Sequence, residues 1–123
     1  MAKKIMVVDD EPFIIEMLQV TLTDAGFEVV VATEGTEVFP KVLAEKPDLI
    51  SLDVNMPGKH GFEICRELKA DPATKHIPVI FLSASTQADD VNKGIALGAE
   101  KYMTKPVPLA EYEAVIKGIL KMS

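Results

Sequence analysis

The sequence lacks the features that would place it in a membrane, outside the cell or on nucleic acid. Cys65 is the single cysteine in 123 residues, so no internal disulfide can form and a reducing compartment is favoured. No apolar run approaches the ~18–20 residues that span a bilayer, and no secretory h-region follows the N-terminus. The net charge is −6 with no block of Lys or Arg, which argues against nucleic acid or an anionic membrane as a direct partner. These absences predict a cytoplasmic protein.

The length and composition predict one globular domain. A chain of 123 residues with 48% hydrophobic and 26% charged residues is ordinary for such a domain. There is no repeat at solenoid spacing, no low-complexity tract and no linker. We therefore expect residues 1–123 to form a single domain without a second, effector domain.

Short apolar runs alternate with longer segments of helical periodicity, five of each. The runs, expected to be strands, are Ile5–Val8, Phe27–Ala32, Leu49–Leu52, Val79–Leu82 and Tyr102–Thr104. The segments expected to be helices are 12–25, 35–45, 61–70, 87–97 and 108–121. This alternation predicts an α/β fold with a doubly wound parallel sheet and helices on both faces. The first four runs are almost continuously apolar, as expected for strands that are covered on both sides.

One proline interrupts this pattern. Pro40 falls inside the second helical segment, where it would remove a backbone hydrogen bond and clash with the preceding turn. We expect that helix either to be kinked or to begin only near Pro40.

Acidic residues stand at the ends of two of the predicted strands. Asp9 and Asp10 close the first run, and Asp53 closes the third. If both runs are parallel strands of one sheet, these carboxylates meet at the same edge and repel one another strongly. A hard divalent cation such as Mg2+ would relieve the repulsion, because it prefers oxygen ligands. The placement predicts a metal-assisted site.

The ends of the fourth and fifth runs add a hydroxyl and an ammonium group to this edge. They are Ser83 and, just beyond the fifth run, Lys105. Together with the carboxylates they suit phosphoryl transfer to a carboxylate, which forms an acyl phosphate. A lysine and a divalent ion would neutralise charge on the phosphoryl oxygens, and a hydroxyl can donate to one of them.

Each of these residues has a structural alternative when it is considered alone. Asp10 would serve as the N-cap of the helix that begins at Pro12, and Asp53 as a loop acid. Ser83 would bond to backbone, and Lys105 would be a solvated loop lysine. Their coincidence at strand ends that must be neighbours favours the functional interpretation.

With these residues in view, the chain resembles the receiver domains of two-component response regulators over essentially its whole length. The matching segments are Val7–Glu11, Leu52–Gly58, Gly61, Leu82–Ala84 and Lys105–Pro106. Each motif is weak alone, but all of them occur in order, each at the end of a predicted strand. The resemblance implies a flavodoxin-like sheet with strand order 2-1-3-4-5.

The resemblance also implies a role for each site residue. Asp53 would be the phosphoacceptor, and Mg2+ would be bound by Asp10, by Asp9 directly or through water, by Asp53 and by the backbone carbonyl of Asn55. Lys105 would contact the phosphoryl group, and its peptide bond to Pro106 would be cis.

A conformational switch is implied as well. Ser83 would turn toward the phosphoryl group and Tyr102 would rotate inward, which changes the surface of the fourth helix, fifth strand and fifth helix. In the family, the positions of Asn55 and Ser85 tune the lifetime of the phosphate. His60, which follows Lys59, departs from the family pattern because receivers commonly carry an acidic residue there.

The implied partners are proteins. A histidine kinase or histidine phosphotransfer protein would donate the phosphoryl group, and it would dock near Ile14, Ile15 and Met17 on an unusually apolar first helix. A downstream target protein would read the switched surface. We therefore expect a signalling module rather than an enzyme, although receivers catalyse part of their own phosphorylation and dephosphorylation.

Four other functions remain open on sequence alone. The module could be a phosphorelay intermediate that passes its phosphate onward, or a pseudo-receiver that only binds. An aspartyl-nucleophile phosphatase would require an acidic residue as general acid at the position of Asn55, and a cap insertion that binds the substrate. A flavodoxin-like cofactor binder would need a Ser/Thr/Gly-rich loop after the first strand, where the acidic residues would repel phosphate without a metal.

Overall fold

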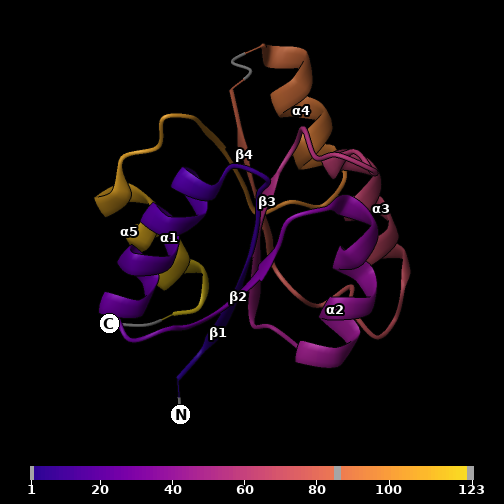
Figure 1. Cartoon of the computed structure of the whole chain (residues 1–123). Helices are drawn as coiled ribbons and strands as arrows, with labels where there is room; N and C mark the ends of the chain where they lie inside the picture. Colours follow the sequence, from indigo (N-terminus) through magenta and orange to yellow (C-terminus); the bar gives the residue numbers. More distant parts are fainter. Residues whose placement is uncertain (1, 85–86, 122–123) are drawn as a thin grey trace.

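A computed structural model describes residues 2–84 and 87–121, in which five parallel strands form one sheet (Figure 1). The strands are β1 (Lys4–Val8), β2 (Glu28–Ala32), β3 (Leu49–Asp53), β4 (Val79–Ser83) and β5 (Lys101–Thr104). The helices are α1 (Pro12–Asp24), α2 (Val38–Glu45), α3 (Gly61–Ala70), α4 (Ala88–Ala96) and α5 (Leu109–Ile119), with a short 3-10 helix η1 (Gly35–Glu37) before α2. The sheet order is β2-β1-β3-β4-β5, so the predicted fold class and order 2-1-3-4-5 are confirmed.

The sheet separates two hydrophobic cores, because alternate residues of each strand face opposite sides. Helices α1 and α5 cover one face, and α2, α3 and α4 cover the other (Figure 1). On β1, for example, Ile5 and Val7 belong to the α1/α5 core, whereas Met6 and Val8 belong to the opposite core. The central strands β3 and β4 are buried throughout, as their continuous apolar runs predicted.

Helix α2 begins near Pro40, as one of the two alternatives predicted. Pro40 is the third residue of the helix, a position where the backbone N–H has no partner within the helix. The predicted segment 35–45 therefore divides into η1 and α2. Within the described part of the chain, no helix is both long and apolar enough to cross a membrane.

Backbone hydrogen bonds tie together the loops that follow the strands. Gly61 N at the start of α3 donates to the Val54 carbonyl at 2.7 Å, and Val54 N donates to the Leu82 carbonyl at 3.1 Å. Lys105 N donates to the Ser83 carbonyl at 2.7 Å. These bonds fix the carboxyl ends of β3, β4 and β5 relative to one another.

Candidate functional site

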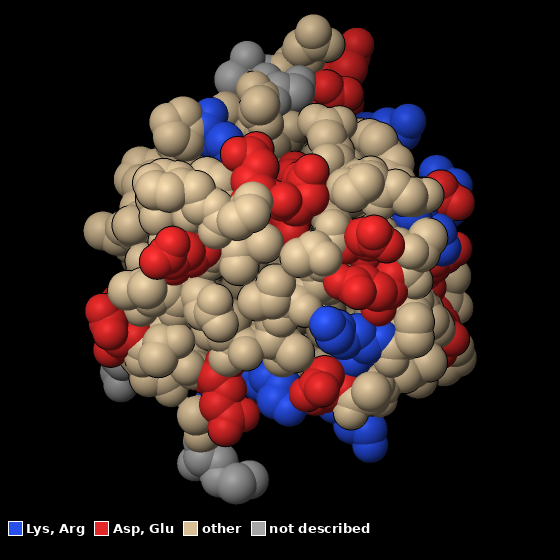
Figure 2. Space-filling model, in the orientation of Figure 1, with Lys and Arg blue, Asp and Glu red and all other residues tan. Residues whose placement is uncertain are grey.

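The three predicted carboxylates meet at the carboxyl end of the sheet. Asp9, Asp10 and Asp53 each offer an oxygen, and these oxygens lie within 4.8 Å of one another. Asp9 and Asp53 are buried, with 1% and 6% of their surface exposed, whereas Asp10 is exposed. Figure 2 shows acidic atoms gathered at this upper end of the molecule. The cluster joins the ends of β1 and β3, which are neighbours in the sheet.

Lys105 supplies the positive charge of the cluster. Its Nζ lies 2.8 Å from Asp9 Oδ2 and 3.2 Å from Asp53 Oδ2. Burial raises the pKa of Asp53; the nearby Lys105 opposes this increase, and Asp9 adds to it. Burial disfavours the charged form of Lys105, but its hydrogen bond to Asp9 and the charge of Asp53 outweigh that effect and raise its pKa. The lysine therefore stays charged between the two buried acids.

Backbone N–H groups orient the two buried carboxylates. Glu11 N donates to Asp9 Oδ1 at 3.0 Å, and Asn55 N donates to Asp53 Oδ1 at 3.2 Å. In each aspartate, Oδ1 accepts from the loop that follows the strand and Oδ2 accepts from Lys105. Each carboxylate is thus held by a backbone N–H two residues further along the chain and by the distant Lys105 side chain.

The donor set fits a hard divalent cation. Three carboxylates face a single lysine, so the ionised cluster carries more negative than positive charge. Carboxylate oxygens are the ligands that Mg2+ and Mn2+ prefer, and the exposed Asp10 leaves the cluster open to solvent on one side. A cation bound there would offset the repulsion between the acids.

Ser83 ends β4, the strand next to β3, and Tyr102 lies on β5, two residues before the end of that strand. Ser83 is fully buried at the end of β4, one register position beyond the Asp53–Leu82 pair. Tyr102 is half-buried on β5, and its ring packs at 6.2 Å from that of Phe81, with a tilt of 55° between the rings. The peptide bond between Lys105 and Pro106 is cis, as expected.

Comparison of this chain with known proteins identifies its family. Residues 5–117 match the model of the response regulator receiver domain. The chain belongs to the response regulator receiver family. The alkaline phosphatase synthesis transcriptional regulatory protein PhoP of Bacillus subtilis is 42% identical to this receiver over 123 residues. That match covers 100% of this chain but 50% of PhoP, so the receiver spans about half the length of this relative.

Solved receiver structures have the same fold. The chemotaxis response regulator CheY4 of Vibrio cholerae superimposes with a TM-score of 0.90 at 31% identity, covering 97% of this receiver and 99% of CheY4. The Mn(2+)-bound form of response regulator Rcp1 superimposes with a TM-score of 0.81 at 30% identity, covering 95% and 91% of the two chains.

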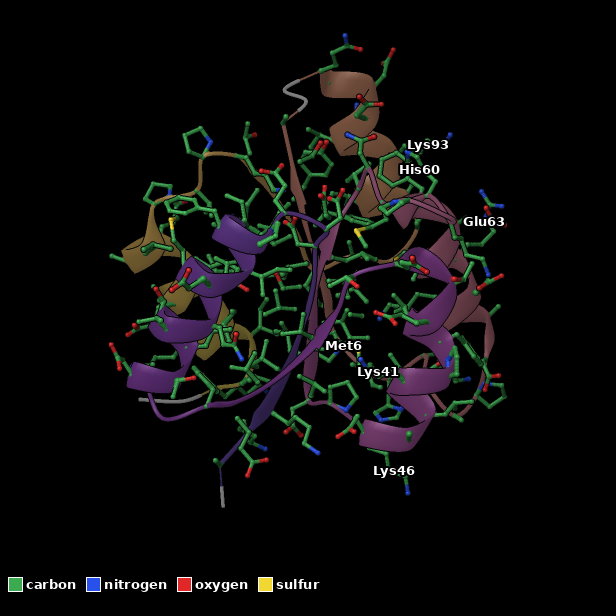
Figure 3. All side chains as sticks on the ribbon, in the orientation of Figure 1. Met6, Lys41, Lys46, His60, Glu63 and Lys93 are labelled. Atoms are coloured by element: carbon green, nitrogen blue, oxygen red, sulfur yellow. The ribbon has the colours of Figure 1, made fainter. Side chains whose placement is uncertain are left out.

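Residues at the start of α3 and in the loop before it make contacts that sequence reasoning missed. His60 Nδ1 accepts a hydrogen bond from Phe62 N at 3.1 Å, so His60 is the N-cap of α3, and its ring meets the edge of Phe62 at 5.0 Å. Lys93 of α4 lies 5.6 Å from the centroid of Phe62, and Figure 3 shows it beside His60. Lys59 pairs with Glu67 at 2.9 Å, which offsets its charge. The N-cap role of His60 could have been predicted from its position directly before the predicted helix.

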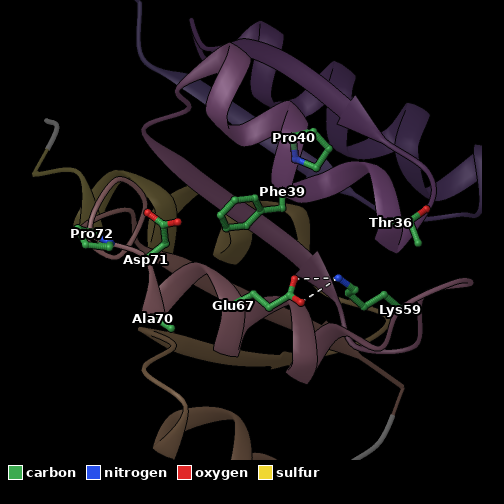
Figure 4. A pocket seen from close by; sticks show the side chains of 8 residues that line it. All are labelled: Thr36, Phe39, Pro40, Lys59, Glu67, Ala70, Asp71 and Pro72. Atoms are coloured by element: carbon green, nitrogen blue, oxygen red, sulfur yellow. Dashed lines mark hydrogen bonds and ion pairs between the residues drawn. The ribbon is translucent and has the colours of Figure 1, made fainter.

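A cavity between α2 and α3 lies away from the acidic cluster. It has a volume of about 520 Å³ and opens between α2 and α3, where Figure 4 shows Phe39 beside the Lys59–Glu67 ion pair. Its lining consists of Thr36, Phe39, Pro40, Lys59, Glu67, Ala70, Asp71 and Pro72. The cavity shares no residue with the acidic cluster.

The predicted partner surface is only partly exposed. Ile14, Ile15 and Met17 are all half-buried, and Ile14 packs against the α1/α5 core. The most exposed apolar side chains of α1 are Phe13 and Val20, with 69% and 54% of their surface exposed. They line a groove of about 350 Å³ together with Glu16, Met17, Thr21 and Leu109. Ser85, the other predicted lifetime residue beside Asn55, lies outside the described residues.

Proposed function

We propose that this receiver accepts a phosphoryl group on Asp53 from the phosphohistidine of a histidine kinase or histidine phosphotransfer protein. A carboxylate oxygen of Asp53 forms a bond to phosphorus while the bond from phosphorus to the histidine nitrogen breaks, and its electron pair returns to the imidazole. The product is an acyl phosphate on Asp53. The observation that carries the proposal is the buried Asp53 carboxylate held between Lys105 and two further acids.

Asp9, Asp10 and Asp53, with the backbone carbonyl of Asn55, would hold Mg2+. The Mn(2+)-bound form of the similar Rcp1 supports a divalent ion in this fold. When bound, the ion would neutralise charge on the phosphoryl oxygens. Lys105 would contact the phosphoryl group, because its Nζ lies 3.2 Å from Asp53 Oδ2, within reach of an oxygen of a group attached there.

Phosphorylation would then change the surface formed by α4, β5 and α5. The Ser83 hydroxyl would donate to a phosphoryl oxygen, and the Tyr102 ring would rotate inward against Phe81. A phosphoryl group brings about −1.5 to −2 charge and strong acceptors, which is enough to bias such a two-state element. A downstream target protein would read the result in the cytoplasm, and the kinase would dock on α1 near Ile14, Ile15 and Met17.

The proposed function is tested by the mass of the intact protein after incubation with acetyl phosphate. A gain of about 80 Da, dependent on Mg2+ and abolished by EDTA, is expected for one phosphoryl group on a carboxylate. Asp53→Asn should abolish the gain. The matched control Asp24→Asn, at the exposed end of α1, should retain it.

Because rapid hydrolysis could hide the product, a beryllofluoride titration with Mg2+ accompanies the mass measurement. Wild-type protein that neither gains mass nor responds to beryllofluoride would refute the proposal and favour a pseudo-receiver. Undiminished labelling of Asp53→Asn would refute the assignment of the acceptor.

A further inference from the structure

Two buried hydroxyl groups lie in the α1/α5 core without a hydrogen-bond partner among the described residues. They are Ser51 Oγ on β3 and Tyr112 Oη in α5. Ser51 is 1% exposed and Tyr112 is 0% exposed. By contrast, the buried hydroxyl of Thr74 donates to the Leu68 carbonyl at 2.6 Å. An unpaired buried hydroxyl costs free energy, so the pair at Ser51 and Tyr112 requires an explanation.

The strand register places Ser51 directly below the acidic cluster. Ser51 and Asp53 are two residues apart on β3, so their side chains point to the same face of the sheet. Ser51 pairs with Val7 of β1, and Val7 stands two residues before Asp9. Ser51 therefore occupies the row beneath the carboxylates, on the side covered by α1 and α5.

Tyr112 reaches the same place from α5. It lies in the first part of the helix, soon after the loop that carries Lys105, and its ring packs in the core that contains Val7 and Met103. Burial raises the pKa of Tyr112; the Ser51 hydroxyl opposes this effect in part, and the Asp9 carboxylate increases it. The strand register and the packing of α5 thus bring both hydroxyls into the core on the face of the sheet that carries Asp9.

Asp9 has the capacity to accept a further hydrogen bond. Its Oδ1 accepts from Glu11 N and its Oδ2 from Lys105 Nζ, and a carboxylate has about four lone-pair sites. A water molecule with two hydroxyls and a carboxylate around it has the three or so polar partners that buried waters usually have.

We propose that Ser51 and Tyr112 are positioning residues for Asp9, acting through a buried water molecule that links their hydroxyls to its carboxylate. The water accepts hydrogen bonds from the Ser51 and Tyr112 hydroxyls and donates to the Asp9 carboxylate. This inference rests on the proposed function, because Asp9 matters here as a metal ligand. It adds an outer shell to the metal site and connects that site to α5, a helix that contributes to the switched surface.

Mg2+ titration of the full 15N-labelled chain, followed by amide chemical shifts, tests this assignment. Removal of an outer-shell partner typically weakens metal binding by 10–100-fold. We expect Tyr112→Phe and Ser51→Ala each to raise the Mg2+ dissociation constant about tenfold. The double variant should resemble either single variant, because both residues act along one path. Thr74→Val, which removes a paired buried hydroxyl elsewhere, should lower the urea midpoint and leave Mg2+ affinity unchanged.

The outcomes separate this inference from the proposed function. Wild-type protein that does not bind Mg2+ overturns the proposed function. Wild-type protein that binds Mg2+ while both single variants bind within twofold of it overturns only the role of the hydroxyl pair. A loss of affinity in Thr74→Val equal to that in Ser51→Ala would also overturn it, since affinity would then follow general stability. If Tyr112→Phe does not fold, the smaller change Ser51→Ala decides the question.

Discussion

Replacement of Gly61 by alanine should damage both the stability and the chemistry of this receiver. A Cβ at Gly61 would lie 2.6 Å from the Asp53 carbonyl oxygen, 2.7 Å from Val54 Cα and 2.9 Å from the Val54 carbonyl oxygen. All three neighbours are backbone atoms, so no side-chain rotation can relieve the contact. The start of α3 must therefore move away from the end of β3, although Gly61 N is bonded to the Val54 carbonyl.

The size of the effect follows from this geometry. The Cβ would be about 0.7 Å too close to Val54 Cα for ordinary van der Waals contact. Overpacking typically costs ~1–3 kcal/mol, and we expect the upper end, about 3 kcal/mol, because the neighbours are rigid. With a urea m-value of ~1–3 kcal/mol/M, the unfolding midpoint should fall by roughly 1–3 M. A displacement of this size at Asp53 should also slow phosphoryl uptake by about 10–100-fold.

Gly118→Ala provides the matched control. Gly118 lies in α5, and among the described residues no heavy atom outside its own helix backbone and chain neighbours lies within 4 Å of a Cβ placed there. The same substitution should therefore stabilise the protein by ~0.5–1 kcal/mol, since alanine favours a helix over glycine. Urea unfolding, monitored by circular dichroism, gives the free energy of unfolding of both variants. A Gly61→Ala protein with wild-type stability and labelling rate would show that α3 is not held tightly against β3, which would refute the reasoning.

Three further predictions concern charge, metal and thiol chemistry. A backbone hydrogen bond from Thr33 chiefly lowers the pKa of Glu37, so Glu37 stabilises the fold above its unfolded pKa and ceases to do so as pH falls through its lowered folded value. Glu37→Ala should cost about 0.5 kcal/mol in urea unfolding at pH 7, since solvent screens this exposed carboxylate, and an equal cost in strong acid would contradict this origin. Mg2+ at 100 times its dissociation constant should stabilise the wild type by ~2.7 kcal/mol; an equal gain in Asp10→Asn would place the ion elsewhere. Burial raises the pKa of Cys65, so iodoacetamide should alkylate it at least ~10-fold more slowly in the native protein than in urea, and equal rates would refute its burial.

Much of the fold could be predicted because its signals are local. A continuous apolar run such as Val79–Leu82 between turn residues is typical of a strand covered on both faces, and it forms the buried β4. Pro40 restricts where α2 can begin for a purely steric reason, and the helix starts two residues before it. The placement of Asp9 and Asp53 at strand ends likewise followed from the chain itself.

Local signals could not predict contacts that depend on how distant segments pack. His60 was identified as unusual, but its role as the N-cap of α3 depends on the backbone angle at which the loop enters the helix. The resemblance to receiver domains implied that a partner docks near Ile14, on a helix with more apolar residues than one core face needs. The packing of α1 on the sheet, together with α5, decided that Ile14 faces the core and Phe13 faces solvent.

The sequence by itself therefore determined which chemical groups end each strand and that these strands are parallel. Hydrophobic periodicity and turn residues act over a few positions, and they suffice for that. Only the tertiary structure decided that Lys105 bonds both Asp9 and Asp53, across 96 and 52 residues of chain. It also decided that Ser51 of β3 and Tyr112 of α5 bury their hydroxyls on the same side of the sheet. Such contacts depend on register and helix packing, which are set by the whole core at once.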